Sequence, residues 1–141
     1  MTAGPDYEAI LRRYIRELWQ RGNLAIIDEL TTPDYKRYAA PGAPPLDRAG
    51  HKERVVAFRE AFPDLAWAPQ AFVIQGVMVA FHLVGTATHR GTFQGVAATG
   101  RPVTMVSIDI VRFDGDKMAE HWGARDDWSI LRQLGARLAD P

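Results

Sequence analysis

The chain has 141 residues, of which 47% are hydrophobic, and its 17 basic and 17 acidic residues give a formal net charge of zero. This composition is typical of one folded domain, residues 1–141, and the interspersed charges exclude a strong attraction to nucleic acid or to an anionic membrane. The chain has no cysteine for disulfides, no apolar run near the ~18 residues of a membrane span and no signal peptide in MTAGPDYEA, so we expect a cytoplasmic protein.

The first elements are predicted to be helices. From Pro5 to Arg21, apolar residues recur at three- and four-residue spacing and form one broad stripe, with charged residues opposite. A glycine–asparagine pair ends this helix, and a shorter one follows from Leu24 to Leu30 and stops before a proline. The aromatic residues of the stripe include Tyr14 and Trp19, which suit either a pocket wall or plain core packing.

The middle of the chain returns to helical periodicity after an irregular stretch. Asp34 to Ala40 is predicted as a short strand or helix. Pro41 to Pro45 is rich in proline and glycine, which predicts a loop that forms a rim or lid. Gly50 to Phe62 is predicted as a helix whose apolar face includes Phe58.

The pattern then changes to strands. Leu65 to Ile74 is predicted to be extended and to lie at a sheet edge, because Pro69 cannot donate a ladder hydrogen bond. Val77 to Arg90 is predicted as a long strand. Gly91 to Gly100 is glycine-rich but lacks the lysine and following helix of a phosphate-binding loop, so it is given no nucleotide role.

The last third of the chain predicts a hairpin and a closing helix. Between Val103 and Asp127, two apolar runs flank Asp114-Gly115-Asp116, a strong hairpin signal. Trp128 to Leu138 is predicted as an amphipathic helix, with Leu138 on its inner side. Helices followed by a meander of antiparallel strands predict an α+β fold, in which helices cover one face of a curved sheet. Such a cone can enclose a dry, apolar site for a small ligand.

Strand alternation assigns side chains to the two faces of this sheet. One face of the first hairpin strand carries Met105, Ser107, Asp109, Val111 and Phe113. The same face is predicted to receive His121 and Gly123 from the next strand, and Phe81, Leu83, Gly85, Ala87 and His89 from the long strand. Glu120 and Trp122 alternate to the outer face, where a tryptophan suits a dimer interface.

Several segments occur in an order and spacing that are specific together: FREAFPDL at 58–65, GTATHRGTFQGVAATGRPVT at 85–104, IDIVRFDGDKMAEHW at 108–122 and LRQLG at 131–135. With LWQRGNL in the first helix, nearly the whole chain resembles the SnoaL-like polyketide cyclase (ester cyclase) family. The resemblance implies a nuclear transport factor 2-like fold, a cystatin-like α+β barrel in which a cone-shaped antiparallel sheet packs against N-terminal helices. It also implies a homodimer through the outer sheet face.

The resemblance further implies chemistry and site residues. Enzymes of this family act on hydrophobic rings by acid–base chemistry without a metal or organic cofactor, and the cyclases close a polyketide ester by an aldol reaction. Their acid–base carboxylate lies on the last strand, two positions after a histidine. That histidine matches His121, so the carboxylate position matches Gly123, which has no side chain. The other matched positions are Ser107, Asp109, His89 and Asp126.

We therefore expect Asp109 to replace the missing carboxylate, with proton transfer assisted by His121 and His89. A buried Asp109 favours its neutral form and becomes a proton shuttle, and a hydrogen bond to His121 would supply a base and its orienting group. The substrate is expected to be a hydrophobic, oxygenated small molecule that undergoes cyclisation, isomerisation, dehydration or hydrolysis. The residues expected to bind it are Tyr14, Trp19, Phe58, Phe62, Phe81, Met105 and Ser107.

Each candidate also has a structural interpretation. Asp109 would be stable inside the protein if paired with an arginine, for which the chain offers Arg90, Arg112 and Arg125. His121 fits a hydrogen-bonded core position, and Asp126 fits the N-cap of the last helix. The remaining histidines, His51 and His82, are assigned no role.

A metal site is not expected. His89, Asp109, His121 and Asp126 are ligands of suitable type, but the sequence holds no closely spaced ligand pair such as H-x-x-x-H. Epoxide hydrolysis, known in the same superfamily, needs an aspartate–arginine–aspartate set, whereas the inward positions of the long strand are Leu83, Gly85 and Ala87.

A second function remains open on these residues: a non-catalytic module that binds a ligand in the cone or a protein partner on its outer sheet. The absence of the carboxylate at Gly123 keeps this alternative open. An open cone with titratable groups in contact would favour the enzyme, and a filled cone with Asp109 paired to an arginine would favour the module.

Overall fold

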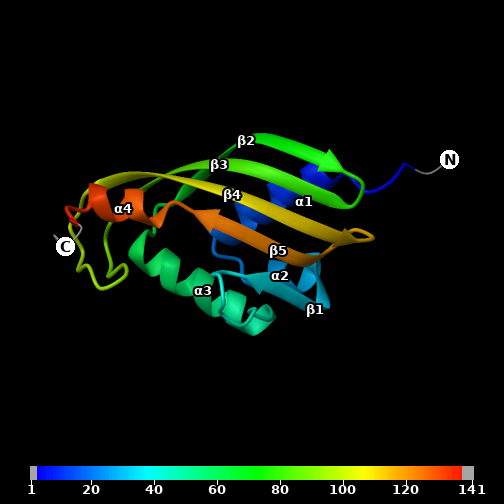
Figure 1. Ribbon diagram of the computed structural model, residues 1–141, viewed down its shortest axis with the longest axis horizontal. Helices are drawn as coiled ribbons and strands as arrows, with labels where there is room; N and C mark the ends of the chain where they lie inside the picture. The colour runs from blue at the N-terminus through cyan, green and yellow to red at the C-terminus, as the bar shows by residue number, and fades with distance from the viewer. Residues whose placement is uncertain (1–2, 138–141) are drawn as a thin grey trace.

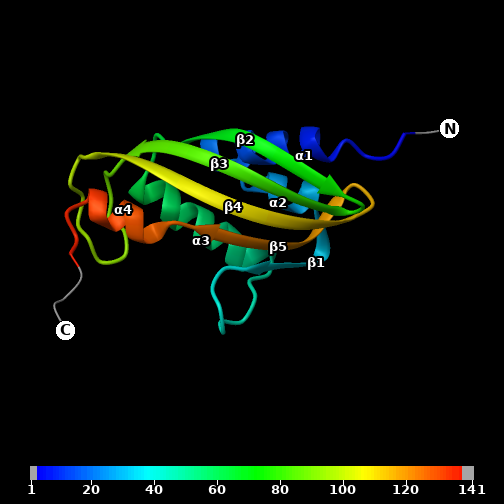
Figure 2. The ribbon, with the colours of Figure 1, turned by 45° about the horizontal axis from the view of Figure 1, so that its top comes forward.

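The computed structural model describes residues 3–137. Within these residues, one sheet holds its strands in the order β1-β5-β4-β3-β2. The strands are β1 (Thr31–Tyr38), β2 (Ala66–Gln75), β3 (Met78–Thr88), β4 (Pro102–Asp114) and β5 (Lys117–Arg125). The helices α1 (Tyr7–Tyr14), α2 (Ala25–Leu30) and α3 (Arg48–Ala61) lie along one face of this curved sheet (Figures 1 and 2). The predicted α+β architecture is confirmed.

The N-terminal helix is shorter and less regular than predicted. It begins after Asp6, whose carboxylate accepts a hydrogen bond from the backbone N–H of Ala9, so Pro5 lies outside it. Beyond Tyr14 the chain continues as a π-helical segment, η1 (Ile15–Gln20). An apolar spacing of three and four residues does not separate α from π turns, which explains why the sequence predicted one uninterrupted helix.

The ambiguous segment after α2 is a strand, and it pairs in an unexpected direction. β1 runs parallel to β5 and places Arg37 opposite His121. The sheet is therefore not the purely antiparallel meander predicted from chain order. Because β1 is an edge strand, it tolerates Pro33, which has no N–H to donate.

The remaining strands agree closely with the prediction. β2, which contains Pro69, is the other edge strand of the sheet. Burial alternates strictly along β4, so Asp109 points to the same interior as Ser107 and Val111. The β4–β5 hairpin turns at Gly115, whose φ of 60° requires a glycine-like conformation. β3 is three residues shorter than predicted, since it begins at Met78 instead of Val77 and ends at Thr88 instead of Arg90.

Aromatic side chains fill much of the space between the sheet and the helices. Trp67 on β2 lies across Gly85 on β3, where an added Cβ would come within 2.6 Å of the indole ring. Other large buried side chains come from the helices, from β1 and from β4; they include Tyr14, Tyr35, Phe62 and Phe113. The cone is thus a packed core over most of its volume.

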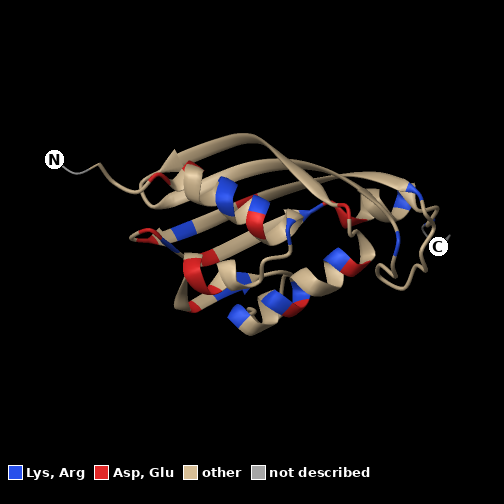
Figure 3. Cartoon of the chain, turned by 180° about the vertical axis from the view of Figure 1, so that it is seen from behind, with Lys and Arg blue, Asp and Glu red and all other residues tan. Residues whose placement is uncertain are grey.

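The C-terminal part of the described chain is α4 (Asp127–Gln133), at one end of the sheet (Figure 1). Leu138, predicted on its inner side, lies outside the described residues. None of the helices within 3–137 is long and apolar enough to cross a membrane. Seen from the helix side, acidic and basic residues are interspersed along the helices (Figure 3).

Candidate active site

Asp109 lies inside the cone, as strand alternation predicted. Its side chain is 7% exposed. Its Oδ2 atom is 2.6 Å from Nε2 of His121 on the neighbouring strand, and its Oδ1 accepts a hydrogen bond of 2.5 Å from the hydroxyl of Ser107. The predicted hydrogen bond between Asp109 and His121 is therefore confirmed.

Asp109 is also paired with an arginine, and the partner is Arg37. Its Nη1 lies 3.5 Å from Asp109 Oδ2 and 2.5 Å from His121 Nε2. The arginines predicted for this pairing, Arg90, Arg112 and Arg125, are therefore the wrong ones. Arg37 reaches the site because β1 joins the sheet beside β5, a pairing that no local pattern encodes.

The contacts around Nε2 of His121 restrict where protons reside. This nitrogen either donates its proton to Asp109 or accepts one from Arg37, and it cannot do both. If Nε2 accepts a hydrogen bond from Arg37, it has no N–H to donate, and the Asp109 oxygen then faces the nitrogen without a hydrogen between them unless the carboxyl is itself protonated. With Asp109 ionised, a proton lies between Asp109 Oδ2 and His121 Nε2 only when Nε2 carries it, and this is the contact that a proton shuttle needs.

Burial and charge set the resting protonation. Burial alone would raise the pKa of Asp109, but the hydrogen bond and charge of His121, together with Arg37 and Ser107, lower it to about 2. Burial and the positive charge of Arg37 lower the pKa of His121 to about 4, although Asp109 opposes this shift. At neutral pH the site therefore holds a carboxylate and a neutral imidazole. The prediction of a neutral Asp109, which rested on burial alone, is wrong. The hydrogen bonds and charges of its partners lower the pKa by more than burial raises it.

Gly123 faces this cluster directly. It is the cross-strand partner of Asp109 in the β4–β5 ladder. A Cβ at Gly123 would lie 2.7 Å from Nη2 of Arg37 and 2.8 Å from Oδ2 of Asp109. The space that a side chain at this position would enter is therefore filled by the Asp109 carboxylate and the Arg37 guanidinium.

Buried hydroxyl and imidazole groups extend the cluster toward the helices. The hydroxyl of Tyr35 is 3.2 Å from Nδ1 of His121, so it donates there when Nε2 carries the proton. The hydroxyl of Tyr14 is 2.7 Å from Nε2 of His51. Burial, followed by the charge of Arg37, lowers the pKa of His51 well below its usual value, so its imidazole is neutral.

Local sequence patterns do place these additional residues in the interior. His51 received no role, although it precedes Val55 and Phe58 at helical spacing and therefore shares their buried face. Tyr35 and Arg37 alternate along β1 and so share its inner face. Neither pattern identifies Asp109 as the partner, because that contact depends on strand pairing.

A small cavity of about 20 Å³ opens above Asp109. Its walls include Arg37, Ser107 and Asp109, whereas His121 lies behind the carboxylate and does not line it. The aromatic walls are Trp19 and Trp67, and the remaining ones are Leu83, Arg54 and Arg125. A cavity of this size holds about one water molecule.

The seven residues predicted to bind substrate are all buried, but they occupy different places. Trp19 and Ser107 line the Asp109 cavity, and Phe58 lines an adjoining groove. The rings of Tyr14 and Phe81 lie 6.1 Å from the His121 ring. The remaining two, Phe62 and Met105, line neither hollow. Contact with a substrate stays a prediction for each of them.

The other two predicted catalytic residues lie apart from this cluster. His89 follows the end of β3, where its Nδ1 is 3.0 Å from the Thr99 hydroxyl and its ring packs against Phe62. Among the described residues, no hydrogen bond joins His89 to Asp109 or His121. Asp126 is exposed and caps α4, since its Oδ1 accepts a hydrogen bond from the backbone N–H of Ser129. The N-cap interpretation of Asp126 is confirmed.

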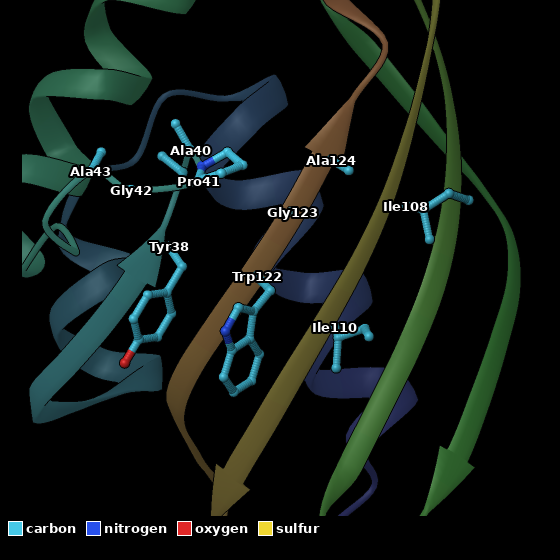
Figure 4. A pocket seen from close by; sticks show the side chains of 11 residues that line it. Tyr38, Ala40, Pro41, Gly42, Ala43, Ile108, Ile110, Trp122, Gly123 and Ala124 are labelled. Atoms are coloured by element: carbon cyan, nitrogen blue, oxygen red, sulfur yellow. The ribbon is translucent and has the colours of Figure 1, made fainter.

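Within residues 3–137, no group of three or more histidine, aspartate or glutamate side chains is arranged as a metal site. A wider hollow, of about 540 Å³, lies on the outer face of the sheet (Figure 4). There Trp122 stacks on Tyr38 with ring centroids 5.3 Å apart, beside Ile108 and Ile110. The loop 39–43 borders this outer hollow, so the expected rim or lid does not line the Asp109 cavity.

Comparisons with known proteins agree with the fold. The model of the SnoaL-like polyketide cyclase family matches residues 9–134. The structure is similar to a candidate polyketide cyclase from Acidithiobacillus ferrooxidans, with 32% identity, 96% of this chain and 98% of that chain covered, and a TM-score of 0.83. IdmH, a candidate polyketide cyclase from Streptomyces antibioticus, is 29% identical over 93% of this chain and 99% of that chain, with a TM-score of 0.81.

AclR, a candidate hydroxylase from Streptomyces galilaeus, is 28% identical over 92% of this chain and 96% of that chain, with a TM-score of 0.82. The names of these similar proteins therefore refer to more than one reaction, cyclisation and hydroxylation. None of the curated proteins matches the sequence.

Proposed function

Because the chain belongs to the SnoaL-like polyketide cyclase family and has its nuclear transport factor 2-like fold, we propose that it is a cofactor-free enzyme that moves a proton on a hydrophobic, oxygenated small molecule. One observation carries this proposal. The Asp109 carboxylate, in contact with His121, fills the space that a side chain at Gly123 would enter. Asp109 supplies the family's acid–base carboxylate from the opposite strand of the hairpin.

Each residue of the cluster has a separate role in this mechanism. Asp109 borders the cavity and accepts the substrate proton, while His121 behind it orients the carboxylate and shares the proton. Ser107 holds the second carboxylate oxygen in place. Arg37 also lines the cavity, and its charge stabilises the oxyanion that forms when a proton leaves the carbon next to a carbonyl.

The low pKa of Asp109 indicates which protons it can remove. A carboxylate with a pKa of about 2 is a weak base, and efficient proton transfer needs a base matched to the acidity of the substrate. We therefore propose that the substrate carries its reacting hydrogen between two carbonyl groups, as in a β-keto ester. Cyclisation or isomerisation through an enolate fits this pairing.

The size of the cavity favours a second function, a non-catalytic ligand-binding or interaction module. A cavity of about 20 Å³ accepts no substrate unless wall side chains such as Trp19 or Trp67 move. The ion pair of Asp109 with Arg37 also fits a purely structural role. The apolar hollow on the outer sheet face would then be the functional surface, for a protein partner.

Deuterium exchange separates the two functions without knowledge of the natural substrate. The α-hydrogen of ethyl 2-oxocyclohexanecarboxylate, a cyclic β-keto ester, is followed by proton NMR in D₂O with and without the protein. We expect protein-dependent exchange above the buffer rate, and we expect Asp109→Asn to lower it by about 100-fold or more. Asp114→Asn, which makes the same change in the exposed hairpin turn, is the matched control and should keep the rate.

Unchanged exchange in Asp109→Asn would remove Asp109 from the mechanism. If the wild-type protein gives no exchange above the buffer rate, while a protein partner binds the outer sheet face, the non-catalytic function is the correct one.

A further inference from the structure

Arg54 lines the Asp109 cavity, and within residues 3–137 it forms no ion pair. It comes from α3 and, with Arg125 from β5, borders both that cavity and the adjoining groove. The nearby carboxylates are engaged elsewhere, since Asp109 pairs with Arg37 and Asp127 pairs with Arg125. Within the described part of the chain, the buried Nε of Arg54 has no hydrogen-bond partner. A buried donor without a partner is costly and indicates a missing acceptor.

The charges around Arg54 leave an excess of positive potential. Burial, together with the positive charges of Arg37 and Arg125, lowers the pKa of Arg54 to about 10, although Asp127 and Asp109 raise it. The guanidinium remains charged at neutral pH, but it is partly shielded from solvent and lies near two other positive charges, Arg37 and Arg125. An anion bound beside it would relieve both penalties.

The groove next to Arg54 combines cations with aromatic walls. It has a volume of about 220 Å³. Phe58 and Phe93 line it, and the Arg125 guanidinium stacks over the Phe58 ring at 4.1 Å. The Arg125 side chain is held there by two hydrogen bonds to Asp127, of 2.5 and 3.2 Å. The groove is therefore suited to a ring system that carries a negative group.

We propose that Arg54, assisted by Arg125, binds a carboxylate of the substrate in this groove, with the substrate's ring against Phe58 and Phe93. A guanidinium matches a carboxylate by paired, planar hydrogen bonds, which a neutral ester does not reproduce. The assignment of the bound acid as the substrate rests on the proposed function. The link between the two sites is that the groove and the Asp109 cavity share Arg54 and Arg125 as walls. This anion site narrows the proposed substrate class to a carboxylic acid that carries a ring.

The test is a binding titration with 2-naphthoate and its neutral methyl ester, followed by NMR of the protein at pH 7 and low salt. We expect the acid to bind at least about tenfold more tightly than the ester, since a hydrogen bond to a charged group contributes about that much. Arg54→Gln should remove this preference by weakening binding of 2-naphthoate and leaving the ester unchanged. Arg16→Gln, which removes an exposed charge outside the groove, should preserve it.

Equal affinities for acid and ester, or an unchanged preference in Arg54→Gln, would overturn the proposal. Arg54→Gln should fold normally, because no hydrogen bond or ion pair of this side chain is present within residues 3–137; its thermal unfolding checks this. Arg54→Lys keeps the charge and should recover part of the preference.

Asp109→Asn distinguishes a failure of this site from a failure of the proposed function. It removes a negative charge from the wall of the cavity, so 2-naphthoate should bind as tightly as before or more tightly. If β-keto ester exchange survives Asp109→Asn while Arg54→Gln still abolishes the preference for the acid, the anion site stands and the role of Asp109 does not. The reverse result rejects the anion site alone.

Discussion

At the scale of single residues, the site is defined by ionisable groups that are buried together. Asp109, Arg37 and His121 are each at most 5% exposed. Separately, each would be expensive to bury, but together they satisfy one another. The same contacts that stabilise the Asp109 anion also weaken it as a base, so its structural and chemical roles are linked. This link is the reason for proposing a substrate with an acidic carbon–hydrogen bond.

The buried histidine His121 predicts a protein that loses stability in mild acid. Its pKa is about 4 in the folded protein and about 6.5 in an unfolded chain, so between these values the unfolded state binds the additional proton. The stabilisation is present above pH 6.5 and is lost as the pH falls toward 4. From pH 7 to pH 5 the free energy of unfolding should fall by about 2 kcal/mol from this residue alone, measured by urea denaturation.

The carboxylate of Asp109 affects the stability of the protein in a lower pH range. Its pKa is lowered to about 2, so its contribution is present above the ordinary aspartate value and is lost only as the pH falls from about 4 toward 2. His121→Gln should make the dependence between pH 7 and pH 5 shallower by about one proton, whereas His82→Gln, at a partly exposed strand position, should keep the wild-type slope. A slope that is the same in His121→Gln and wild type would contradict the assignment.

At the scale of elements, the β4–β5 hairpin and the edge strand β1 build the site together. The hairpin places Asp109 opposite Gly123, and β1 adds Arg37 beside His121. Gly123 is required because the two side chains from other strands occupy the space above it. The absence of a side chain at this position, which from sequence looked like the loss of a catalytic group, makes room for another carboxylate.

Gly123→Ala tests this packing. The new methyl group would lie within 2.8 Å of both the Asp109 carboxylate and the Arg37 guanidinium, so one of them must move. We expect a loss of about 1–3 kcal/mol in the free energy of unfolding, typical of overpacking, and a slower β-keto ester exchange. Gly4→Ala is the matched control, because an added Cβ there meets nothing within 4 Å. Equal stability of the two variants would show that the space above Gly123 is open.

At the scale of the whole molecule, the sheet has a polar cluster on its inner face and an apolar outer face. Val106, Ile108 and Ile110 are exposed on that outer face at 38%, 49% and 40%. Trp122 and Tyr38 extend the surface toward β1, beside the hollow in Figure 4. A contiguous apolar surface of this kind is typical of an interface, and we propose that a second copy of the chain covers it.

The oligomeric state tests this proposal. Ile108→Glu places a charge in the centre of the outer face and should convert a dimer to a monomer in sedimentation equilibrium, because an unpaired buried charge is strongly unfavourable. Val56→Glu introduces the same charge at an exposed apolar position on α3 and should leave the dimer intact. A wild-type protein that sediments as a monomer at micromolar concentration would exclude this interface.

Much of the fold was determined by the sequence alone, because the relevant signals are local. Helical spacing predicted α3, and alternation along β4 predicted that Asp109 points inward. The turn at Gly115 fixed the hairpin, whereas the contact between Asp109 and His121 also needs the register shift between Arg112 and Phe113, which no local pattern predicted. The order of the segments identified the family, which the match over residues 9–134 confirms.

Other features were decided only by the tertiary structure. Arg37 became the partner of Asp109 through the parallel pairing of β1 with β5, which joins residues far apart in the chain. His89 and Asp126 were expected at the site but lie where β3 and β5 have already ended. A local pattern states which face a side chain takes, whereas the neighbours on that face depend on strand order and on where each strand stops. For this reason the sequence predicted the inward carboxylate, and the tertiary structure supplied its charge partners.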